Sequence, residues 1–448
     1  MKRTFTQGLT YPKIVALGFM ILIVIGTILL MLPIATRDGC STSFTDAFFT
    51  STSASCVTGL IVADTYAHWT LFGQIVILCL IQVGGLGFLT ILTMFSMFFK
   101  RKIGLRERSL LQESVNTMYI GGIVRLVKKI LIGTFAIEIL GAAALATRFI
   151  PKMGVGVGIY NSIFTSITAF CNAGFDLMGR YEEFSSLITF RDDIVVNVTI
   201  IILILSGGIG FFVWDDITVN KFRFSHYKLH TKLVLLSTAV LVIGGTLLFY
   251  ITESDTVLEG LGIKEKINAS AFMAVTPRTA GFNTTDVASM SPAGKLFTII
   301  LMFIGGNPGS TAGGVKTITI LIMLLSVWSN LRNKSEINVL KKRLEPDVLK
   351  RAATVVTINL TLIVVCEMII CMTNPGFSLV DVTIEVVSAM GTVGMSTGIT
   401  RELDTIARYV LIFLMYCGRV GSLSFALLFT EHKTHDTVQN PMEKVNIG

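Results

Sequence analysis

The chain has 448 residues, of which 52% are hydrophobic and only 15% are charged. Soluble domains carry about 25% charged residues, so this composition excludes an ordinary soluble domain and indicates a polytopic membrane protein. The net charge of +8 comes from short, separate basic stretches beside apolar segments. Such stretches favour anionic lipid or a protein partner over nucleic acid.

Apolar stretches of membrane-spanning length recur along the chain. A helix needs about 20 apolar residues to cross a bilayer. The first stretch is too long for a cleaved signal, whose apolar region has about 7–15 residues, so we expect a retained helix. We predict eight spans, at 12–35, 72–99, 125–147, 194–214, 230–251, 296–328 (interrupted), 352–373 and 406–430.

Lysine and arginine concentrate on alternate connections, in 100–129, 221–232 and 332–351, and occur again near both ends of the chain. The positive-inside rule places these parts, and both termini, in the cytoplasm. The predicted organisation is a cytoplasmic N-terminus (1–11), four repeats (12–99, 125–215, 230–328, 352–430), cytoplasmic connections (100–124, 216–229, 329–351) and a cytoplasmic tail (431–448). The charged connection 329–351 is compatible with a helix.

One short glycine segment occurs four times, at intervals of 107 to 115 residues. Each copy follows a half-helix, predicted at 43–55, 160–170, 267–277 and 379–390, that is too short to span a bilayer. Non-helical backbone at membrane depth is tolerated where it is buried in protein or lines a watery cavity. The copies are Val57-Thr58-Gly59, Asn172-Ala173-Gly174, Thr279-Ala280-Gly281 and Thr392-Val393-Gly394.

Four such loops around one axis predict a ring of backbone carbonyls that replaces the hydration shell of a monovalent cation. Glycine permits the positive φ that such a loop needs, and the C-terminal end of each half-helix favours a cation. A single copy would be read as an ordinary turn. Four copies in the same register favour a shared function over four ordinary turns.

A second glycine motif follows each loop glycine, 24 or 25 residues later in three repeats and 33 in the second. In the third repeat it contains too many glycines, and a proline, for a regular helix. One interpretation is a packing kink; the other is a flexible gate beneath the ring, with Lys316 facing the pore or reaching the cytoplasmic surface. The segment comprises Gly305, Gly306, Asn307, Pro308, Gly309, Ser310, Thr311, Ala312, Gly313, Gly314, Val315 and Lys316.

Arg419 lies within the last apolar stretch, and an intramembrane arginine indicates function by default because of its cost. It either bonds the carbonyls of the glycine-rich segment and repels cations below the ring, or pairs with a buried carboxylate. Arg278 is expected to brace its loop. Glu138, Glu367 and Glu385 are read as groups that form interhelical hydrogen bonds or pair with an arginine, rather than as a proton relay. Asp64, Asp176 and Asp286 are read as cation-attracting or merely solvated loop charges.

The chain resembles the Ktr/Trk/HKT superfamily of potassium transporters, most closely the bacterial Ktr membrane subunit. The resemblance rests on Ser55–Leu60, Phe170–Phe175, Thr276–Phe282 and Gly391–Met395. It implies an all-α membrane protein with eight transmembrane helices and four re-entrant pore helices, forming four membrane-pore-membrane repeats around a pseudo-fourfold pore. In that family a glycine at the position of Gly59 accompanies K⁺ preference and a serine accompanies Na⁺.

The resemblance further implies K⁺ at the filter as the only bound metal ion, an intramembrane gating loop at 305–316 beside Arg419, and a homodimer in the bacterial cell membrane. It also implies a separate cytoplasmic ring of nucleotide-binding regulatory subunits, with no cofactor in this chain, and stimulation by Na⁺. Alternatives are a Na⁺-selective member of the superfamily or an alternating-access cation symporter. An embedded enzyme is disfavoured because no HExxH or Walker A pattern is present.

Overall fold

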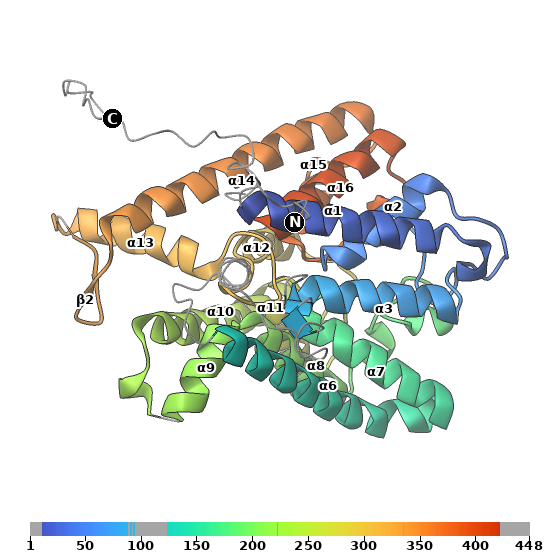
Figure 1. The fold of residues 1–448 in the computed structure, drawn as a ribbon, viewed down its shortest axis with the longest axis horizontal. Helices are drawn as coiled ribbons and strands as arrows, with labels where there is room; N and C mark the ends of the chain where they lie inside the picture. The colour runs from blue at the N-terminus through green and yellow to red at the C-terminus, as the bar shows by residue number, and fades with distance from the viewer. Residues whose placement is uncertain are drawn as a thin grey trace, which may run out of the picture.

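The computed structural model describes residues 11–87, 90–91, 93–94, 123–221, 223–334 and 336–421. The predicted N-terminus (1–11), most of the connection 100–124 and the tail 431–448 therefore lie outside the described residues, apart from their edges. The described chain is almost entirely helical (Figure 1).

Each repeat begins with a long apolar helix: α1 (Tyr11–Leu30), α6 (Ile123–Met153), α10 (Leu229–Glu253) and α14 (Pro346–Thr373). Among the described residues, these four helices are long and apolar enough to cross a membrane. Many of their apolar side chains stay exposed, such as Ile243 and Met372. In a bilayer, that surface faces lipid.

The four predicted half-helices are present, and each follows the long helix of its repeat. They are α2 (Phe44–Ser55), α7 (Val155–Cys171), α11 (Ile263–Val275) and α15 (Leu379–Gly391). Serine side chains cap two of them: Ser43 accepts from the amide of Asp46, and Ser378 from that of Asp381. Their C-terminal halves are buried, so the following loops begin inside the protein.

In the second and third repeats the second helix is broken, as predicted for 296–328 but not for 194–214, whereas in the first and fourth repeats most of the predicted span beyond Gly87 and Gly421 lies outside the described residues. α3 (Leu71–Leu86) and α16 (Thr405–Val420) end before glycines with positive φ, Gly87 and Gly421. α8 (Ile194–Gly208) turns by 95° into α9 (Phe211–Asn220). α12 (Pro292–Phe303) is separated from α13 (Thr317–Leu331) by non-helical chain, as the glycine and proline content predicted.

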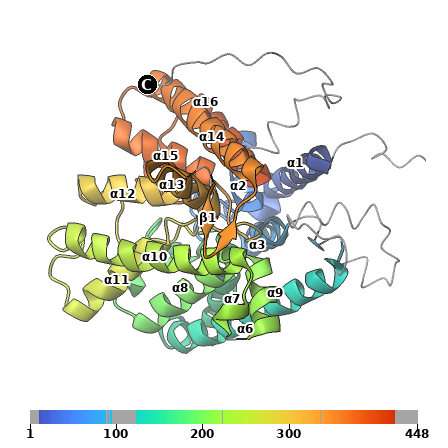
Figure 2. The same cartoon turned by 90° about the vertical axis from the view of Figure 1, so that its left-hand side faces the viewer.

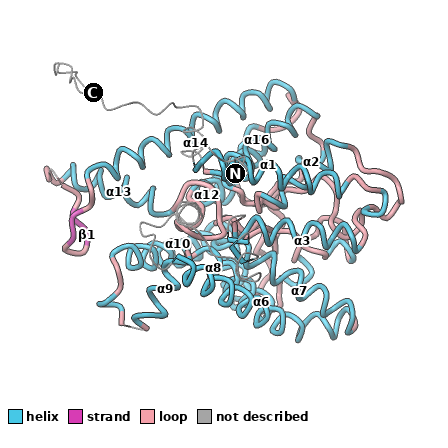
Figure 3. Tube along the Cα trace, in the orientation of Figure 1, coloured by secondary structure: helices cyan, strands magenta, loops and turns pink. Residues whose placement is uncertain are grey.

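The repeats close into a cycle through the second helices. α3 packs on α7, α8 on α11, α12 on α15, and α16 returns to α2 of the first repeat. Figure 2 shows the helices of the four repeats grouped around a common centre, and Figure 3 shows loop segments at that centre. This closure confirms the predicted pseudo-fourfold arrangement.

The connection between the third and fourth repeats contains a small hairpin rather than the helix allowed by its sequence. β1 (Asn338–Val339) pairs antiparallel with β2 (Lys342–Arg343), with Asn338 opposite Arg343. Leu340 and Lys341 at the turn both have positive φ, as two-residue hairpin turns require. The short 3₁₀ helices are η1 (Pro33–Ala35), η2 (Met178–Arg180), η3 (Ile188–Phe190), η4 (Phe224–His226) and η5 (Ile399–Arg401).

Candidate ion-conducting site

The four loop glycines form a closed ring. A Cβ added to Gly59 would collide with the carbonyl of Ala173, and one on Gly174 with the carbonyl of Ala280. A Cβ on Gly281 would meet the carbonyl of Val393, and one on Gly394 that of Thr58. Each loop glycine thus contacts the residue before the next loop glycine, and the last loop contacts the first. Any side chain at these positions would disturb two loops at once.

The loops share one unusual backbone conformation. The ring glycines have φ of 92°, 69°, 77° and 92° in chain order, as glycine allows. The residues two positions earlier also have positive φ, although none is glycine: Val57 (59°), Asn172 (61°), Thr279 (72°) and Thr392 (51°). Positive φ is an outlier for β-branched residues, and such strain gathers at functional sites. Sequence reasoning missed this feature because nothing in these side chains signals it.

Side chains from the half-helices and from neighbouring loops fix the ring. Ser53 accepts from the amide of Gly59 at 3.1 Å, and Ser388 accepts from the amide of Gly394 at the same distance. The Asn172 amide group and the Thr279 hydroxyl lie 3.1 Å apart, which joins the second and third loops directly. The ring is therefore preorganised by buried hydrogen bonds.

The second glycine motif packs on the first, which explains their common register. A Cβ on Gly84, Gly207 or Gly418 would collide with a carbonyl in the last turn of the half-helix of the same repeat. Those carbonyls belong to Ser55, Phe170 and Met390, each four residues before its ring glycine. The third repeat departs from this pattern, because Gly305 lies against Gly313 and Val315 of its own segment.

The segment 305–316 is folded beneath the ring rather than forming a packing kink. Its backbone bonds to the end of α8: the amides of Asn307 and Thr311 donate to Gly208 and Gly207 at 3.1 and 3.2 Å. On the opposite side, a Cβ on Gly313 would meet the side chain of Thr392. The segment therefore reaches from the second repeat to the loop of the fourth.

Two cationic side chains hold this segment. The Arg419 guanidinium donates to the carbonyl of Thr311, to Gly84, and to Gly85 at 3.1 Å, so it joins the fourth repeat to the third and first. The Lys316 ammonium donates to Ala312 at 2.6 Å. Lys316 thus folds back onto its own segment instead of extending to the membrane surface.

Arg278 braces the segment more than its own loop. It is 5% exposed, and its Nη2 lies 3.4 Å from the hydroxyl of Thr317, to which it donates. The Thr317 hydroxyl lies 3.1 Å from the carbonyl of Gly305. A buried guanidinium therefore bonds the first residue of α13, where the segment ends.

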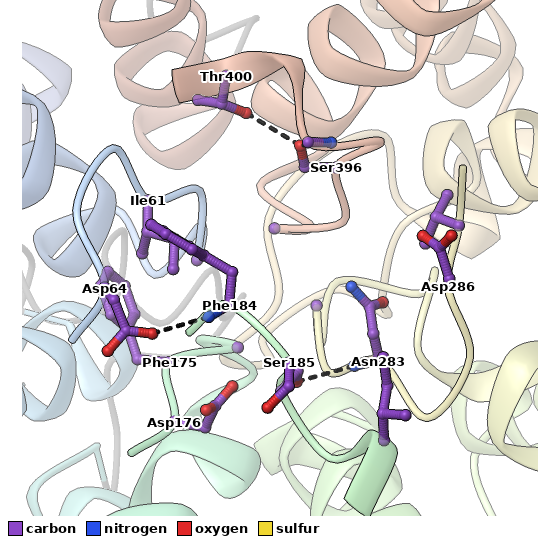
Figure 4. A pocket seen from close by; sticks show the side chains of 18 of the residues that line it. Ile61, Asp64, Phe175, Asp176, Phe184, Ser185, Asn283, Asp286, Ser396 and Thr400 are labelled. Atoms are coloured by element: carbon purple, nitrogen blue, oxygen red, sulfur yellow. Dashed lines mark hydrogen bonds between the residues drawn. The ribbon is translucent and has the colours of Figure 1, made fainter. Parts of the chain in front are cut away.

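Beyond the ring lies an open cavity of about 190 Å³, here called the vestibule. All four ring glycines line it, and each repeat contributes residues that follow its ring glycine (Figure 4). Asp64, Asp176 and Asp286 come from three different loops and line it as well, together with Arg401. The three aspartates therefore lie close to one another around one cavity, next to the four ring glycines.

Asp64 and Asp176 differ in their surroundings. Asp64 is 7% exposed and accepts from the amides of Tyr66, Ala67 and Phe184, the last at 3.0 Å from the second repeat. Burial raises the pKa of Asp176 to about 6, and the charge of Asp64 adds to this shift against hydrogen bonds from Met178 and Ser186. Asp64 thus links the first and second repeats, whereas burial and a neighbouring carboxyl set the pKa of Asp176.

Glu138 and Glu367 form the expected interhelical hydrogen bonds, whereas Glu385 bonds to the loop of its own repeat. Gln82 of α3 donates to Glu138 of α6 at 3.0 Å. Thr383 of α15 donates to Glu367 of α14. Glu385 accepts hydroxyl groups from the chain after Gly394.

One hydrolase-like pattern does occur, since Gly394 to Gly398 read G-M-S-T-G. A nucleophile elbow needs its serine on a strand-to-helix turn with a histidine partner. Here Ser396 follows a pore loop and donates to Glu385. The pattern is therefore no catalytic site.

Comparison with known proteins agrees with this architecture. Residues 10–439 match the family model of TrkH, described as a cation transport protein. The chain belongs to this family. The family is one of cation transporters and not of enzymes. The multi-pass membrane character predicted from composition is also confirmed.

Two relatives are similar over nearly their whole length. The chain is 40% identical to the potassium/sodium uptake protein NtpJ of Enterococcus hirae, covering 100% of this chain and 99% of that protein. It is also 40% identical to the Ktr system potassium uptake protein B of Bacillus subtilis, covering 94% and 93%. These similarities confirm the predicted Ktr/Trk resemblance.

A solved structure shares the fold. The crystal structure of the potassium transporter TrkH from Vibrio parahaemolyticus matches with a TM-score of 0.76 and 20% identity, covering 96% of this chain and 87% of that one. The predicted fold class is thereby confirmed.

Proposed function

We propose that this chain is the ion-translocating subunit of a bacterial potassium uptake system, in which K⁺ crosses one pore per chain through the ring of glycine loops. The closed ring of Gly59, Gly174, Gly281 and Gly394, each facing a neighbouring carbonyl, is the observation that carries the proposal. Rings of backbone carbonyls replace the hydration shell of K⁺. The printed names of the relatives, which include potassium uptake and potassium/sodium uptake, support this assignment.

The selectivity filter would comprise the ring glycines and the two residues before each. Gly59 favours K⁺ over Na⁺ in this assignment, because a side chain there would press on the carbonyl of Ala173 and change the size of the ring. A Na⁺-selective pore is the rival that the experiment below separates.

The segment 305–316 is proposed as the gate. It lies beneath the ring and is held by Arg419 and Lys316 through backbone carbonyls. Two positive charges below the filter repel a permeating cation, so release of the segment and withdrawal of the charges would open the path.

Control of this gate is assigned to a partner. We propose a homodimer in the plasma membrane with both termini in the cytoplasm, contacted by a separate ring of nucleotide-binding subunits and stimulated by Na⁺. The nucleotide would bind to that partner, with K⁺ as the transported ion of this chain. The basic cytoplasmic connections are the proposed docking surface, since the hairpin β1–β2 and its neighbours carry Lys341, Lys342 and Arg343.

The test is uptake of ⁸⁶Rb⁺ into liposomes containing the purified protein, with competition by K⁺ and by Na⁺. Wild-type uptake should saturate and be suppressed by K⁺ at much lower concentration than by Na⁺. Gly59→Ser should reduce the ratio of the Na⁺ to the K⁺ concentration needed to suppress uptake by about tenfold, which corresponds to about 1.4 kcal/mol.

Gly39→Ser is the matched control. Gly39 also has positive φ, but nothing lies within 4 Å of its added Cβ, so discrimination should stay at the wild-type value. Equal K⁺/Na⁺ discrimination in wild type and Gly59→Ser would contradict the filter assignment.

A further inference from the structure

The pore helix of the fourth repeat carries one fully buried carboxylate. Glu385 of α15 is 0% exposed and lies nine residues before its ring glycine, Gly394. The corresponding positions in the other repeats are Thr50, Thr165 and Phe272. A carboxylate behind the ring is therefore a property of one repeat in four.

Glu385 binds the chain that leaves the ring. Thr400 donates its hydroxyl to Oε2 at 2.6 Å, and Ser396 donates to Oε1. Ser396 also accepts from the amide of Gly398 at 2.8 Å. Ser396 is only two residues beyond Gly394, and both hydroxyl residues line the vestibule (Figure 4). The carboxylate thus fixes the outer arm of the fourth loop, residues 395–400.

The other outer arms are tied between repeats. Phe184 of the second repeat donates to Asp64 of the first at 3.0 Å. The amide of Leu187 donates to the carbonyl of Asn283 in the third repeat at 2.9 Å. The hydroxyls of Thr50 and Thr165, at the positions equivalent to Glu385, have no hydrogen-bond partner within the described part of the chain. The fourth loop also contacts the second repeat, because Arg401 lies over the ring of Phe184 at 4.1 Å, but a carboxylate of its own pore helix holds it in addition.

We propose that Glu385 is a positioning residue that sets the ion selectivity of the ring by holding the fourth loop at its fixed place. The proposal rests on the filter function proposed above. Glu385 is the buried acceptor of two hydroxyls from the arm that follows Gly394, and Gly394 itself lies against Thr58 and Gly59 of the first loop. A displaced fourth loop therefore alters the ring at the glycine that carries the K⁺/Na⁺ preference. Cations need not touch the carboxylate.

The experiment measures competition of K⁺ and Na⁺ against ⁸⁶Rb⁺ uptake in proteoliposomes. Glu385→Ala should retain uptake but lower K⁺/Na⁺ discrimination by about tenfold, since two buried hydroxyls lose their acceptor. Glu385→Gln should stay within about twofold of wild type, because an amide still offers an acceptor and a hydroxyl can accept from its NH₂. Ser396→Ala and Thr400→Ala should shift discrimination in the same direction, each by less.

Glu367 provides the matched control. It accepts from Thr383 of the same pore helix, two residues from Glu385, but from the side of α14. Glu367→Gln and Glu367→Ala should therefore keep wild-type discrimination. A loss equal to that of Glu385→Ala would indicate general loosening of α15 and overturn the proposal.

Three further results would overturn or test the positioning role of Glu385. Wild-type discrimination in Glu385→Ala would overturn the positioning role, and a Glu385→Gln defect as large as that of alanine would assign the effect to charge instead. If Glu385→Ala yields no folded protein, Ser396→Ala and Thr400→Ala decide, and unchanged discrimination in both overturns the proposal. Failure of the wild-type protein itself to prefer K⁺ would reject the filter function, which is a separate result.

Discussion

The four glycine loops and the four second helices obey opposite rules. The loops repeat one backbone conformation, with positive φ at the ring glycine and two residues before it. Within the described residues, the second helices end in different ways: α3 and α16 are each followed by a glycine with positive φ, α8 turns by 95° into α9, and α12 gives way to non-helical chain over 304–316. A shared ion site requires equivalent loops, whereas a path that must be closed requires one repeat to differ. Under the proposed function, this difference assigns conduction to the equivalent loops and control to the one repeat that departs from them.

The largest expected effect comes from breaking the equivalence of the loops. Gly281→Ala should lower the rate of ⁸⁶Rb⁺ uptake by about tenfold to a hundredfold. Gly281 has φ of 77°, and an added Cβ would meet the carbonyl of Val393, so the third and fourth loops must both move. Strain of this kind costs about 1–3 kcal/mol and acts directly on the ring.

Gly244→Ala is the control for that substitution. Gly244 lies in α10, and nothing lies within 4 Å of its added Cβ, so uptake should stay at the wild-type value. Normal uptake in Gly281→Ala would mean that the ring is not the conducting element.

The features that all four repeats share were easier to predict from the sequence than those in which the repeats differ. The half-helices and their glycines could be read from the sequence because one short pattern recurs four times. Positive φ at Val57 and Thr392 could not, since β-branched residues oppose that conformation and only the packed ring holds it. Closure of the ring itself depends on contacts between residues more than 100 positions apart in the chain.

The features that differ between repeats were predicted only where the sequence is unusual for a membrane helix. Glycine and proline content marked 305–316, and the charge of Arg419 marked its own position. The bend after Gly208 was missed, because two or three glycines in an apolar run also suit a continuous helix. The partners of Glu385 and Asp64 depend on distant segments, so sequence could suggest hydrogen bonding but not the bonded groups.

An intermediate effect is expected from releasing the asymmetric part. Arg419→Gln should raise basal ⁸⁶Rb⁺ flux by about tenfold, because the variant loses both the positive charge and the fork of donors that binds Thr311, Gly84 and Gly85. Deletion of 309–313 should act in the same direction. Both are measured in proteoliposomes without any regulatory partner.

Arg332→Gln serves as the control for Arg419. Arg332 follows α13 and lies over the ring of Trp328 at 4.5 Å, away from the glycine-rich segment. The basal ⁸⁶Rb⁺ flux of Arg332→Gln should equal that of the wild-type protein. If a well-folded Arg419→Gln protein and the deletion of 309–313 both show wild-type flux, the assignment of the gate to 305–316 is wrong.

The smallest expected effect concerns the vestibule and the charged side chains that line it. Because the pKa of Asp176 is raised to about 6, this carboxyl is negative above that pH and neutral below it. Asp64, Asp286 and Arg401 line the same cavity. Lowering the pH from 7.5 to 5.5 should therefore weaken cation attraction and raise the KM for Rb⁺ by about threefold, with the maximal rate nearly unchanged.

Asp176→Asn should remove most of this pH dependence and show the higher KM already at pH 7.5. The effect should also shrink at high ionic strength, because salt screens an exposed cavity. Asp38→Asn, at an exposed position outside the vestibule, should keep the wild-type profile. An unaltered pH profile in Asp176→Asn would show that the vestibule charge does not govern ion entry, and would leave the carbonyl ring as the sole source of affinity.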